Sequence, residues 1–498
     1  MKIGTVNPCA AAGLPLRAAA VALVAGCLCL VPAAAAQASA YVPGVVIVGY
    51  GSPPLAAAAD AANTMGRLEA AGAPEGTVRI LHLRRGESVW KAIARLRRMR
   101  GVLYAVPDYL AHITDLPLTT TTTTTTPTST SPPPPSSGIP PPSTTYPSWI
   151  PDDPGRAGKP QGWQAMQWNF LPGIGVDAPR AWANLLGVHR AGARGVTVAI
   201  LDTGVAYRNW RHFRKAPDFT WTHFVHPYDF VAHNRYPLDR EGHGTFVAGM
   251  IAESTNNGYG LTGLAYNASI MPVRVLDANG WGDAATIARG IRYAVNHGAQ
   301  VINLSLEFDP SVTAGDIPDI ISALRYAHRR RVVVVSVSGN EGSQEIAYPA
   351  RTPTVISVGA TTRDRCLAEY SNGGRRLDLV APGGGDDASL PTEPSCDPVR
   401  QLPNIFQMTF FNPAHPARFG YPGDWFGTSM AAPEVSAAAA MVIASGVLGP
   451  HPTPDRILAR LEQTAQPLGG SAPNQYYGYG LIDIGAATAP PGSSSATS

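Results

Sequence analysis

Three residues of this chain have side chains that together could perform nucleophilic catalysis: Asp202, His243 and Ser429. The aspartate ends an apolar run, the histidine lies between two glycines, and the serine opens an alanine-rich stretch. A serine hydroxyl is a weak nucleophile until a neighbouring base takes its proton, and that base needs a carboxylate to orient it. These residue types in these settings therefore predict acyl transfer through a serine.

Each of the three residues also has an ordinary explanation when it is taken alone. An aspartate after a strand is often a turn residue, and a histidine between glycines is often a surface or packed residue. The sequence Gly427-Thr428-Ser429 is a common way to begin a helix. The order Asp, His, Ser, with each residue in a suitable setting, favours the catalytic interpretation.

The segments around these residues alternate between apolar strands and helical patterns. Strands that are apolar on both faces and are separated by helices predict an α/β fold with a mostly parallel sheet covered by helices on both faces. Functional groups gather at the carboxyl ends of such strands. A serine at the amino end of a helix also faces unpaired N–H groups. The expected strands are Val196–Leu201, Ile270–Val275, Gln300–Leu306, Val332–Val337 and Val355–Val358, and the expected helices are Thr286–Asn296 and Asp316–Arg329.

At these motifs the chain resembles the subtilisin family of serine proteases, whose catalytic residues have the same order along the chain. The resemblance covers residues 151–487 and implies a subtilisin-like fold and endopeptidase activity on proteins or peptides. It implies that Ser429 is the nucleophile and His243 the general base and acid. It also implies that Asp202 holds the imidazole in its working tautomer.

The resemblance extends to residues that would bind the substrate. Asn340 matches the asparagine that donates a hydrogen bond to the oxyanion in the family, although a simple turn asparagine is the alternative. Ser305 and Leu306 match the end of the strand that pairs with an extended substrate. Ser338 and Gly339, which precede Asn340, complete the expected substrate-binding set.

Three positions depart from the family pattern. Glu307 stands where glycine usually follows Ser-Leu, and Phe246 and Glu434 stand where histidine is usual. A carboxylate at position 307 would favour a basic residue near the cut; a solvated loop glutamate is the alternative. The other two changes leave local packing open.

The loop Thr255–Gly260 resembles a calcium-binding loop of the family, and Asn257 matches its side-chain ligand. Side-chain and backbone oxygens are ligands that suit calcium. A plain Asn-Gly turn explains the same residues. No Cys/His spacing suggests zinc, and we expect no catalytic cofactor.

Residues 1–40 have the pattern of an export signal. A positively charged start is followed by the apolar run Ala18–Val31 and by Ala38-Ser39-Ala40, a cleavage pattern. The run is too short for a transmembrane helix, and no later stretch qualifies. We therefore expect secretion to the periplasm or the medium. A lipoprotein anchored at Cys27 and a buried N-terminal helix are the alternatives.

Export leaves two of the five cysteines in the mature chain, Cys366 and Cys396. An even number of cysteines in an exported protein favours a disulfide. Two free thiols are the alternative.

Residues 41–113 have the pattern of a small α/β unit, which resembles the propeptide of the family. The resemblance rests on Gly86-Glu87-Ser88 before the expected helix and on Val106–Leu110 near the end of the unit. It implies a folding template and an inhibitor of the enzyme. Its expected elements are strands at Val45–Val48, Gly76–Leu83 and Val102–Val106 and a helix at Glu87–Met99.

The predicted organisation is therefore that of an exported precursor. Its parts are a signal peptide (1–40), a propeptide (41–113), a Thr/Pro-rich linker (114–148), a catalytic domain (149–487) and a flexible tail (488–498). We expect a secreted, autoprocessed serine endopeptidase that acts on proteins or peptides and is inhibited by its own propeptide. A non-catalytic binding protein and a peptide ligase with the same residues are the alternatives.

Composition excludes other classes of protein. The chain of 498 residues contains 15% charged and 45% hydrophobic residues, with a net charge of +3. This charge is too small for nucleic-acid binding through a basic surface. The apolar content is too high for a wholly disordered chain.

Overall fold

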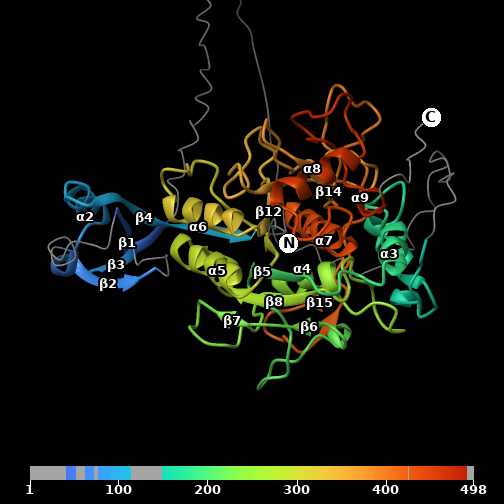
Figure 1. Ribbon diagram of the computed structural model, residues 1–498, viewed down its shortest axis with the longest axis horizontal. Coiled ribbons are helices and arrows are strands. Elements are labelled where there is room, and N and C mark those ends of the chain that lie inside the picture. The colour runs from blue at the N-terminus through green and yellow to red at the C-terminus, as the bar shows by residue number, and fades with distance from the viewer. Residues whose placement is uncertain (1–40, 52–61, 72–76, 114–147, 424, 491–498) are drawn as a thin grey trace, which may run out of the picture. The chain divides into compact units, whose positions relative to one another are not determined.

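The computed structural model describes residues 41–51, 62–71, 77–113, 148–423 and 425–490 (Figure 1). The predicted signal peptide lies outside these ranges, and so does all of the predicted linker except Ser148. Most of the predicted tail lies outside them as well. Within the described residues, no helix is both long and apolar enough to cross a membrane.

A parallel sheet forms the centre of residues 148–490, which confirms the predicted fold class. In the described residues its strand order is β14-β13-β12-β10-β5-β8-β6, and β7 also pairs with β8. Every one of these pairings is parallel. The strands are β5 (Thr197–Asp202), β6 (His223–Phe224), β7 (Tyr228–Asp229), β8 (Ser269–Arg274), β10 (Val301–Leu304), β12 (Val333–Val337), β13 (Ile356–Thr361) and β14 (Leu379–Pro382).

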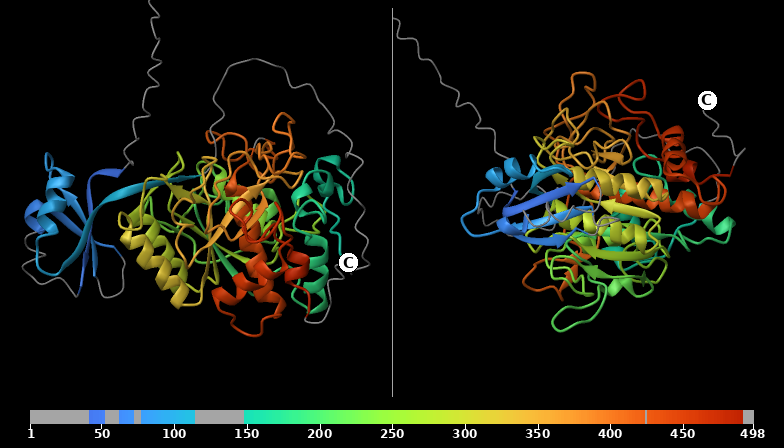
Figure 2. Two further views of the ribbon diagram at one scale, coloured as in Figure 1. Left: turned by 90° about the horizontal axis from the view of Figure 1, so that it is seen from above. Right: turned by 60° about the vertical axis from the view of Figure 1, so that its left-hand side comes forward.

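Helices cover both faces of this sheet. Successive residues of a strand point to opposite faces, so each strand contributes to two apolar clusters. In β5, Val198 and Ile200 join the apolar cluster that contains α4 and α7, whereas Ala199 and Leu201 join the cluster of α5 and α6. Helices α5 and α6 pack side by side (Figure 2). The helices are α3 (Ala178–Gly187), α4 (His243–Ala252), α5 (Ala284–Asn296), α6 (Pro318–Arg329), α7 (Thr428–Ser445), α8 (Pro454–Thr464) and α9 (Ile484–Ala487). A two-stranded ribbon consists of β15 (Thr409–Phe410) and β16 (Phe419–Gly420).

One predicted strand is two strands in the structure. The apolar run Gln300–Leu306 predicts a single strand, but β10 ends at Leu304 and β11 (Leu306–Phe308) belongs to another sheet. Between them the hydroxyl of Ser305 donates a hydrogen bond to the carbonyl oxygen of Ser429 at 3.1 Å. This contact with a distant residue marks the break, and sequence periodicity does not register it.

The described parts of residues 41–113 form an antiparallel sheet with helix α2 packed on it, which confirms the predicted α/β unit. Strand β2, which has no fully buried residue, was not predicted, and the observed helix is shorter than the predicted one at both ends. In the described residues the strands lie in the order β2-β3-β1-β4. The elements are β1 (Tyr41–Tyr50), β2 (Gly66–Ala70), β3 (Val78–Leu83), α2 (Val89–Leu96) and β4 (Val102–Ile113).

Strand β4 pairs with residues of the large α/β part as well as with β1. Its last residues lie between β9 (Trp281–Asp283) and β11, antiparallel to both. Leu110 is paired with Asp283, and Ile113 with Leu306. An extended chain therefore fills the gap between β9 and β11.

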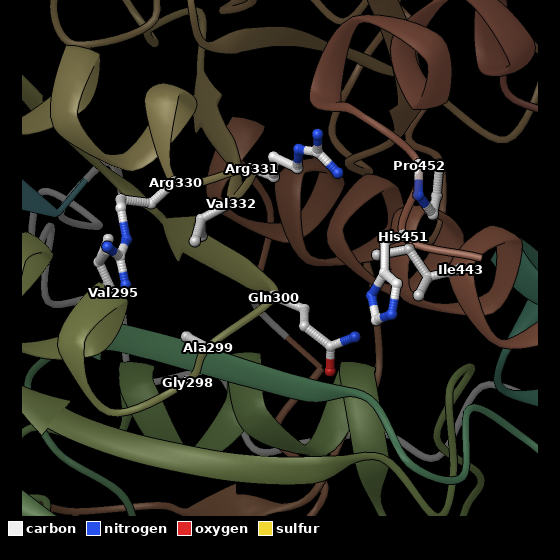
Figure 3. Close-up of a pocket in the computed structure, with 10 residues that line it drawn as sticks. All are labelled: Val295, Gly298, Ala299, Gln300, Arg330, Arg331, Val332, Ile443, His451 and Pro452. Atoms are coloured by element: carbon white, nitrogen blue, oxygen red, sulfur yellow. The ribbon is translucent and has the colours of Figure 1, made fainter.

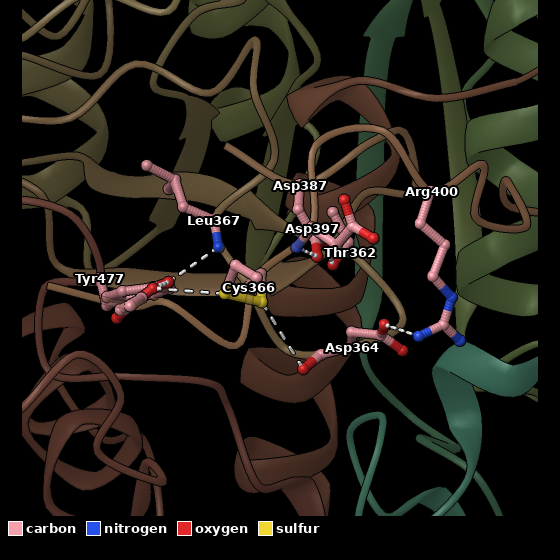
Figure 4. Close-up of a disulfide and its surroundings, with 10 residues drawn as sticks. Thr362, Asp364, Cys366, Leu367, Asp387, Asp397, Arg400 and Tyr477 are labelled. Atoms are coloured by element: carbon pink, nitrogen blue, oxygen red, sulfur yellow. Dashed lines mark hydrogen bonds and ion pairs between the residues drawn. A yellow bond between two sulfur atoms is a disulfide. The ribbon is translucent and has the colours of Figure 1, made fainter. Parts of the chain in front are cut away.

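A disulfide joins Cys366 to Cys396, as the even cysteine count favours, with 5.9 Å between the Cα atoms (Figure 4). The buried carboxylate of Asp387 lies beside it and accepts hydrogen bonds from the hydroxyl of Thr362 and the backbone N–H of Asp397. The bond therefore links two loops that polar contacts also hold together.

Candidate active site

The three catalytic candidates come from three elements at the carboxyl end of the sheet. Asp202 is the last residue of β5, His243 is the first residue of α4, and Ser429 is the second residue of α7. Helices α4 and α7 pack against each other and against β5. All three side chains are fully buried.

The carboxylate of Asp202 orients the ring of His243. Nδ1 of the histidine lies 2.8 Å from Oδ1 and 2.9 Å from Oδ2 of the aspartate. The backbone N–H of Thr203 donates to Oδ1 at 2.6 Å. A carboxylate at Nδ1 keeps the proton on that nitrogen, so Nε2 of the neutral ring is the basic atom.

Gly244 allows this close approach. A Cβ atom at this position would lie 2.1 Å from the carbonyl oxygen of Gly204 and 3.0 Å from Oδ1 of Asp202. Any larger residue would therefore push α4 away from β5.

Asp239 holds the segment that leads into His243, and the sequence analysis did not single it out. Its buried carboxylate accepts hydrogen bonds from the backbone N–H groups of Glu241, Gly242 and Thr245 and from the hydroxyls of Thr203 and Thr245. It thus connects the segment after β5 with the start of α4. Only its place four residues before the histidine hints at this role in the sequence.

The side chain of Asn340 lies beside the start of α7. Its Oδ1 accepts hydrogen bonds from the backbone N–H of Thr428 at 3.0 Å and from the hydroxyl of Thr428 at 2.8 Å. Its Nδ2 is buried and has no hydrogen-bond partner among the described residues. A buried donor without a partner costs about 1–3 kcal/mol, so this amide is suited to an acceptor that arrives next to Ser429.

The predicted substrate-binding residues lie along β11 and the turn after β12. Ser305 is held by Asn303, whose Nδ2 donates to its hydroxyl at 2.9 Å, and Leu306 lies in the apolar cluster of α5 and α6. The backbone N–H of Ser338 donates to the carbonyl of Val358 at 2.8 Å. Gly339 has a φ of +117°, a conformation that side chains disfavour.

The three departures from the family pattern are all buried. Glu307 is 1% exposed within β11, so the solvated-loop alternative is wrong. The ring of Phe246 stacks on Trp425 at 4.9 Å, and Trp425 lies 5.9 Å from the ring of His243. Glu434 accepts a hydrogen bond from Asn169 at 2.6 Å, and burial raises the pKa of this carboxyl well above its ordinary value.

Acidic side chains gather under the predicted calcium loop. Nδ2 of Asn257 donates to Asp218 at 2.7 Å, and the Oδ1 of Asn257 accepts the backbone N–H of Tyr259 at 2.9 Å. Asp153 accepts backbone N–H groups from the same loop. Burial raises the pKa of Asp218 to about 8 and that of Asp153 to about 6.

Glu253 adds a third carboxyl group to this cluster. It is fully buried, and neither of its carboxyl oxygens has a hydrogen-bond partner among the described residues. Burial, followed by the charges of Asp218 and Asp153, raises its pKa well above the ordinary value. None of these three acids was predicted as a site residue, because they meet only in the folded chain.

A hollow of about 370 Å³ lies at the amino ends of the strands of the central sheet (Figure 3). Two of its lining residues, Gln300 and Val332, directly precede β10 and β12. Arg330, Arg331 and His451 also line it. Because it adjoins the amino ends of the strands, it is separate from the site at their carboxyl ends.

Comparison with known proteins identifies two regions. The model of the Subtilase family matches residues 193–480, more than half of the 498 residues. The model of the fervidolysin N-terminal prodomain matches residues 30–108.

Two relatives show how much of the chain is shared. Subtilisin Savinase of Lederbergia lenta is 35% identical over 331 residues, which are 65% of this chain and 99% of that protein. A thermophilic serine proteinase of Bacillus sp. (strain AK1) is 36% identical over 292 residues, or 59% of this chain. The match spans only 61% of that relative's length.

One solved structure shares its fold with most of this chain. Fervidolysin of Fervidobacterium pennivorans superposes with a TM-score of 0.66 at 23% identity, over 90% of this chain and 61% of that one. That similarity concerns the fold alone. The family match covers most of the large α/β part, including β5, α4 and the start of α7, so the chain belongs to the subtilase family of serine peptidases.

Proposed function

We propose that this protein is a secreted endopeptidase that hydrolyses peptide bonds through Ser429, His243 and Asp202. The buried pair of His243 and Asp202 carries the proposal, because β5 and α4, which bear these residues, both pack against α7, whose second residue is Ser429. Asn340 supports it further, since its buried Nδ2 lacks an acceptor among the described residues.

In the proposed reaction, Oγ of Ser429 attacks the carbonyl carbon while Nε2 of His243 takes the hydroxyl proton. The negative charge on the carbonyl oxygen is stabilised by Nδ2 of Asn340 and the backbone N–H of Ser429. The histidine then gives its proton to the leaving amine, and an acyl-enzyme remains. Water, activated by the same histidine, releases the acid product and restores the serine.

We also propose that residues 41–113 are a propeptide that the enzyme removes from itself. In this arrangement 1–40 is the signal, 114–148 the linker, and 149–487 the catalytic domain, with export to the periplasm or the medium. The pairing of Ile113 with Leu306 supports an inhibitory role, because β4 then fills the gap that a substrate would use. It also supports a first cut shortly after Ile113, since Leu306 adjoins Ser305, which contacts Ser429.

A serine-directed phosphonylating reagent tests the proposed chemistry. We expect the processed protein to take up one equivalent of reagent on Ser429, located by peptide mapping, and to lose its hydrolysis of a denatured protein in proportion. A protein that neither takes up label nor cuts denatured protein would instead be a binding protein on the same scaffold.

Replacing Asn340 by alanine should lower kcat by about 10²–10³-fold with a much smaller change in KM, because the oxyanion donor acts mainly in the transition state. Steady-state kinetics with active-site titration would measure this. Asn279→Ala removes an exposed asparagine and serves as the control. An equal loss in both variants, or a loss confined to KM, would contradict the proposed role.

We propose that Asn257, Asp218 and Asp153 hold a structural calcium ion together with carbonyl oxygens of the loop Thr255–Gly260. Oxygen ligands of this kind suit calcium. The buried carboxyl groups there, with the unpartnered oxygens of Glu253 beside them, have no cation among the ion pairs of the described residues. A bound calcium ion would supply the missing positive charge and stabilise the loop.

Removal of calcium by a chelator should therefore lower the melting temperature. At free calcium 100-fold above Kd, binding contributes about 2.7 kcal/mol to stability. Calorimetry with and without chelator would measure this. Asp218→Asn should remove most of the calcium effect, whereas Asp277→Asn in an outer loop should retain it. A chelator effect of the same size in both variants would rule out this site.

A further inference from the structure

Glu307 is a buried acid within the strand that borders the substrate gap. Its neighbours Leu306 and Phe308 point into the apolar cluster of α5 and α6. Because side chains alternate along a strand, Glu307 points to the opposite side. The carboxylate there faces the turn Ser338–Asn340.

The backbone of Gly339 lies against two carboxyl groups. A Cβ atom on Gly339 would lie 2.5 Å from Oε2 of Glu307 and 2.8 Å from Oε2 of Glu341. The amide of Asn372 donates to Glu341, but no donor faces Oε2 of Glu307 among the described residues. Two acids thus share one wall of the gap, and only one of them has a side-chain donor.

The described residues provide no positive charge for this pair. None of their ion pairs involves Glu307 or Glu341. An unpaired buried carboxylate is costly, so it must gain either a proton or a cation. Burial, and then the charge of Glu341, raises the pKa of Glu307 well above its ordinary value. With β4 in the gap, burial and the charge of Glu341 therefore favour the protonated form of the Glu307 carboxyl.

The position of Glu307 relates it to the carbonyl that would be attacked. Its carboxylate lies against Gly339, the residue before Asn340, whose side-chain amide is the proposed oxyanion donor. On the same strand, Ser305 contacts the carbonyl of Ser429. The Glu307 carboxylate thus lies beside Gly339, which directly precedes the asparagine that would hold the reacting carbonyl.

We propose that Glu307 binds the cationic side chain of a lysine or arginine whose carbonyl is attacked, so that the enzyme cuts preferentially after basic residues. This specificity rests on the proposed peptidase function. On binding, the Glu307 carboxyl gives up its proton to solvent and pairs with the ammonium or guanidinium group. The other titratable groups that face this place are Glu341 and Asp309, and, in the precursor, His112 of β4, which is paired with Glu307.

Peptide amides that differ only in the residue before the cut test this proposal, with the full chain allowed to process itself. We expect kcat/KM for arginine and lysine to exceed that for leucine and glutamine by at least about 10-fold. The ratio should rise with pH, because cation binding requires the ionised Glu307. Glu307→Gln should reduce the ratio by at least about 10-fold and remove its pH dependence. Glu345→Gln, which changes an exposed glutamate paired with Arg351, should alter neither.

Two further measurements keep the test decisive. Glu341→Gln should shift the rise of the ratio to lower pH, since it removes a like charge beside Glu307. If Glu307→Gln does not fold, the pH dependence of the ratio in the unaltered enzyme still decides. Equal rates on basic and neutral peptides, or an unchanged ratio in Glu307→Gln, would overturn the specificity alone. If no peptide is cut and Ser429 takes up no label, the peptidase function fails and the specificity fails with it.

Discussion

Ser429→Ala is expected to accumulate as a precursor that keeps the propeptide and to lose peptidase activity by about 10⁶-fold. That is the scale of loss when one member of a triad that acts as a unit is removed. The alanine has no hydroxyl to attack a carbonyl, so neither a substrate nor the bond after β4 is cut. Expression in a host without other proteases, with intact mass measurement, would show the uncut chain.

Two controls separate this loss from misfolding. Ser445→Ala removes a hydroxyl at the far end of the same helix α7, which is hydrogen-bonded to the nearby backbone of Val442 and Val447, and should process normally. Active enzyme added to the Ser429→Ala precursor should remove its propeptide, which shows that the mutant presents the cleavable bond. Spontaneous processing of the mutant in a protease-free host would exclude self-cleavage.

The sequence predicts the central sheet well because its strands are buried on both faces. Runs such as Val332–Val337 are almost wholly apolar, and β12 lies within one residue of this predicted run. Such a run can only be a covered strand of this kind or a buried helix segment, and its length favours the strand. Strand β2 was missed for the opposite reason, since an edge strand with no fully buried residue has no such signal.

The residues of the candidate site divide in the same way. Asp202, His243, Ser429 and Asn340 are found in the sequence because each stands in a local motif of glycines and small residues. Asp239 and the acids under the calcium loop have no such motif. Their importance depends on partners that are brought together by packing: Asp218, for example, meets a loop 39 residues away in the chain.

Glu307 shows the limit most clearly. Its position after Ser-Leu marks it as unusual, but the sequence leaves both a solvated and a substrate-binding glutamate open. Its place in β11, with the carboxylate against Gly339, decides for burial. That outcome depends on the end of β10 before Ser305 and the start of β11 after it, which the apolar pattern does not reveal.

Asp202→Asn should reduce kcat by about 10⁴-fold while the protein remains folded. Oδ1 of Asp202 accepts the backbone N–H of Thr203, so an asparagine would keep its carbonyl oxygen there and turn its NH₂ group toward His243. That group would donate to Nδ1 and leave the ring proton on Nε2. The histidine would then be unable to accept the proton of Ser429.

Kinetics and phosphonylation rates measured together would test this tautomer argument. Both should fall in parallel, because both need a basic Nε2, whereas KM should change little. The chain offers a matched control in Asp455, which also pairs with a histidine: its Oδ1 lies 2.9 Å from Nε2 of His328, but this aspartate is 76% exposed. Asp455→Asn should leave both rates unchanged. If Asp202→Asn kept more than a tenth of the unaltered rate, the buried carboxylate would serve packing and not the tautomer of His243.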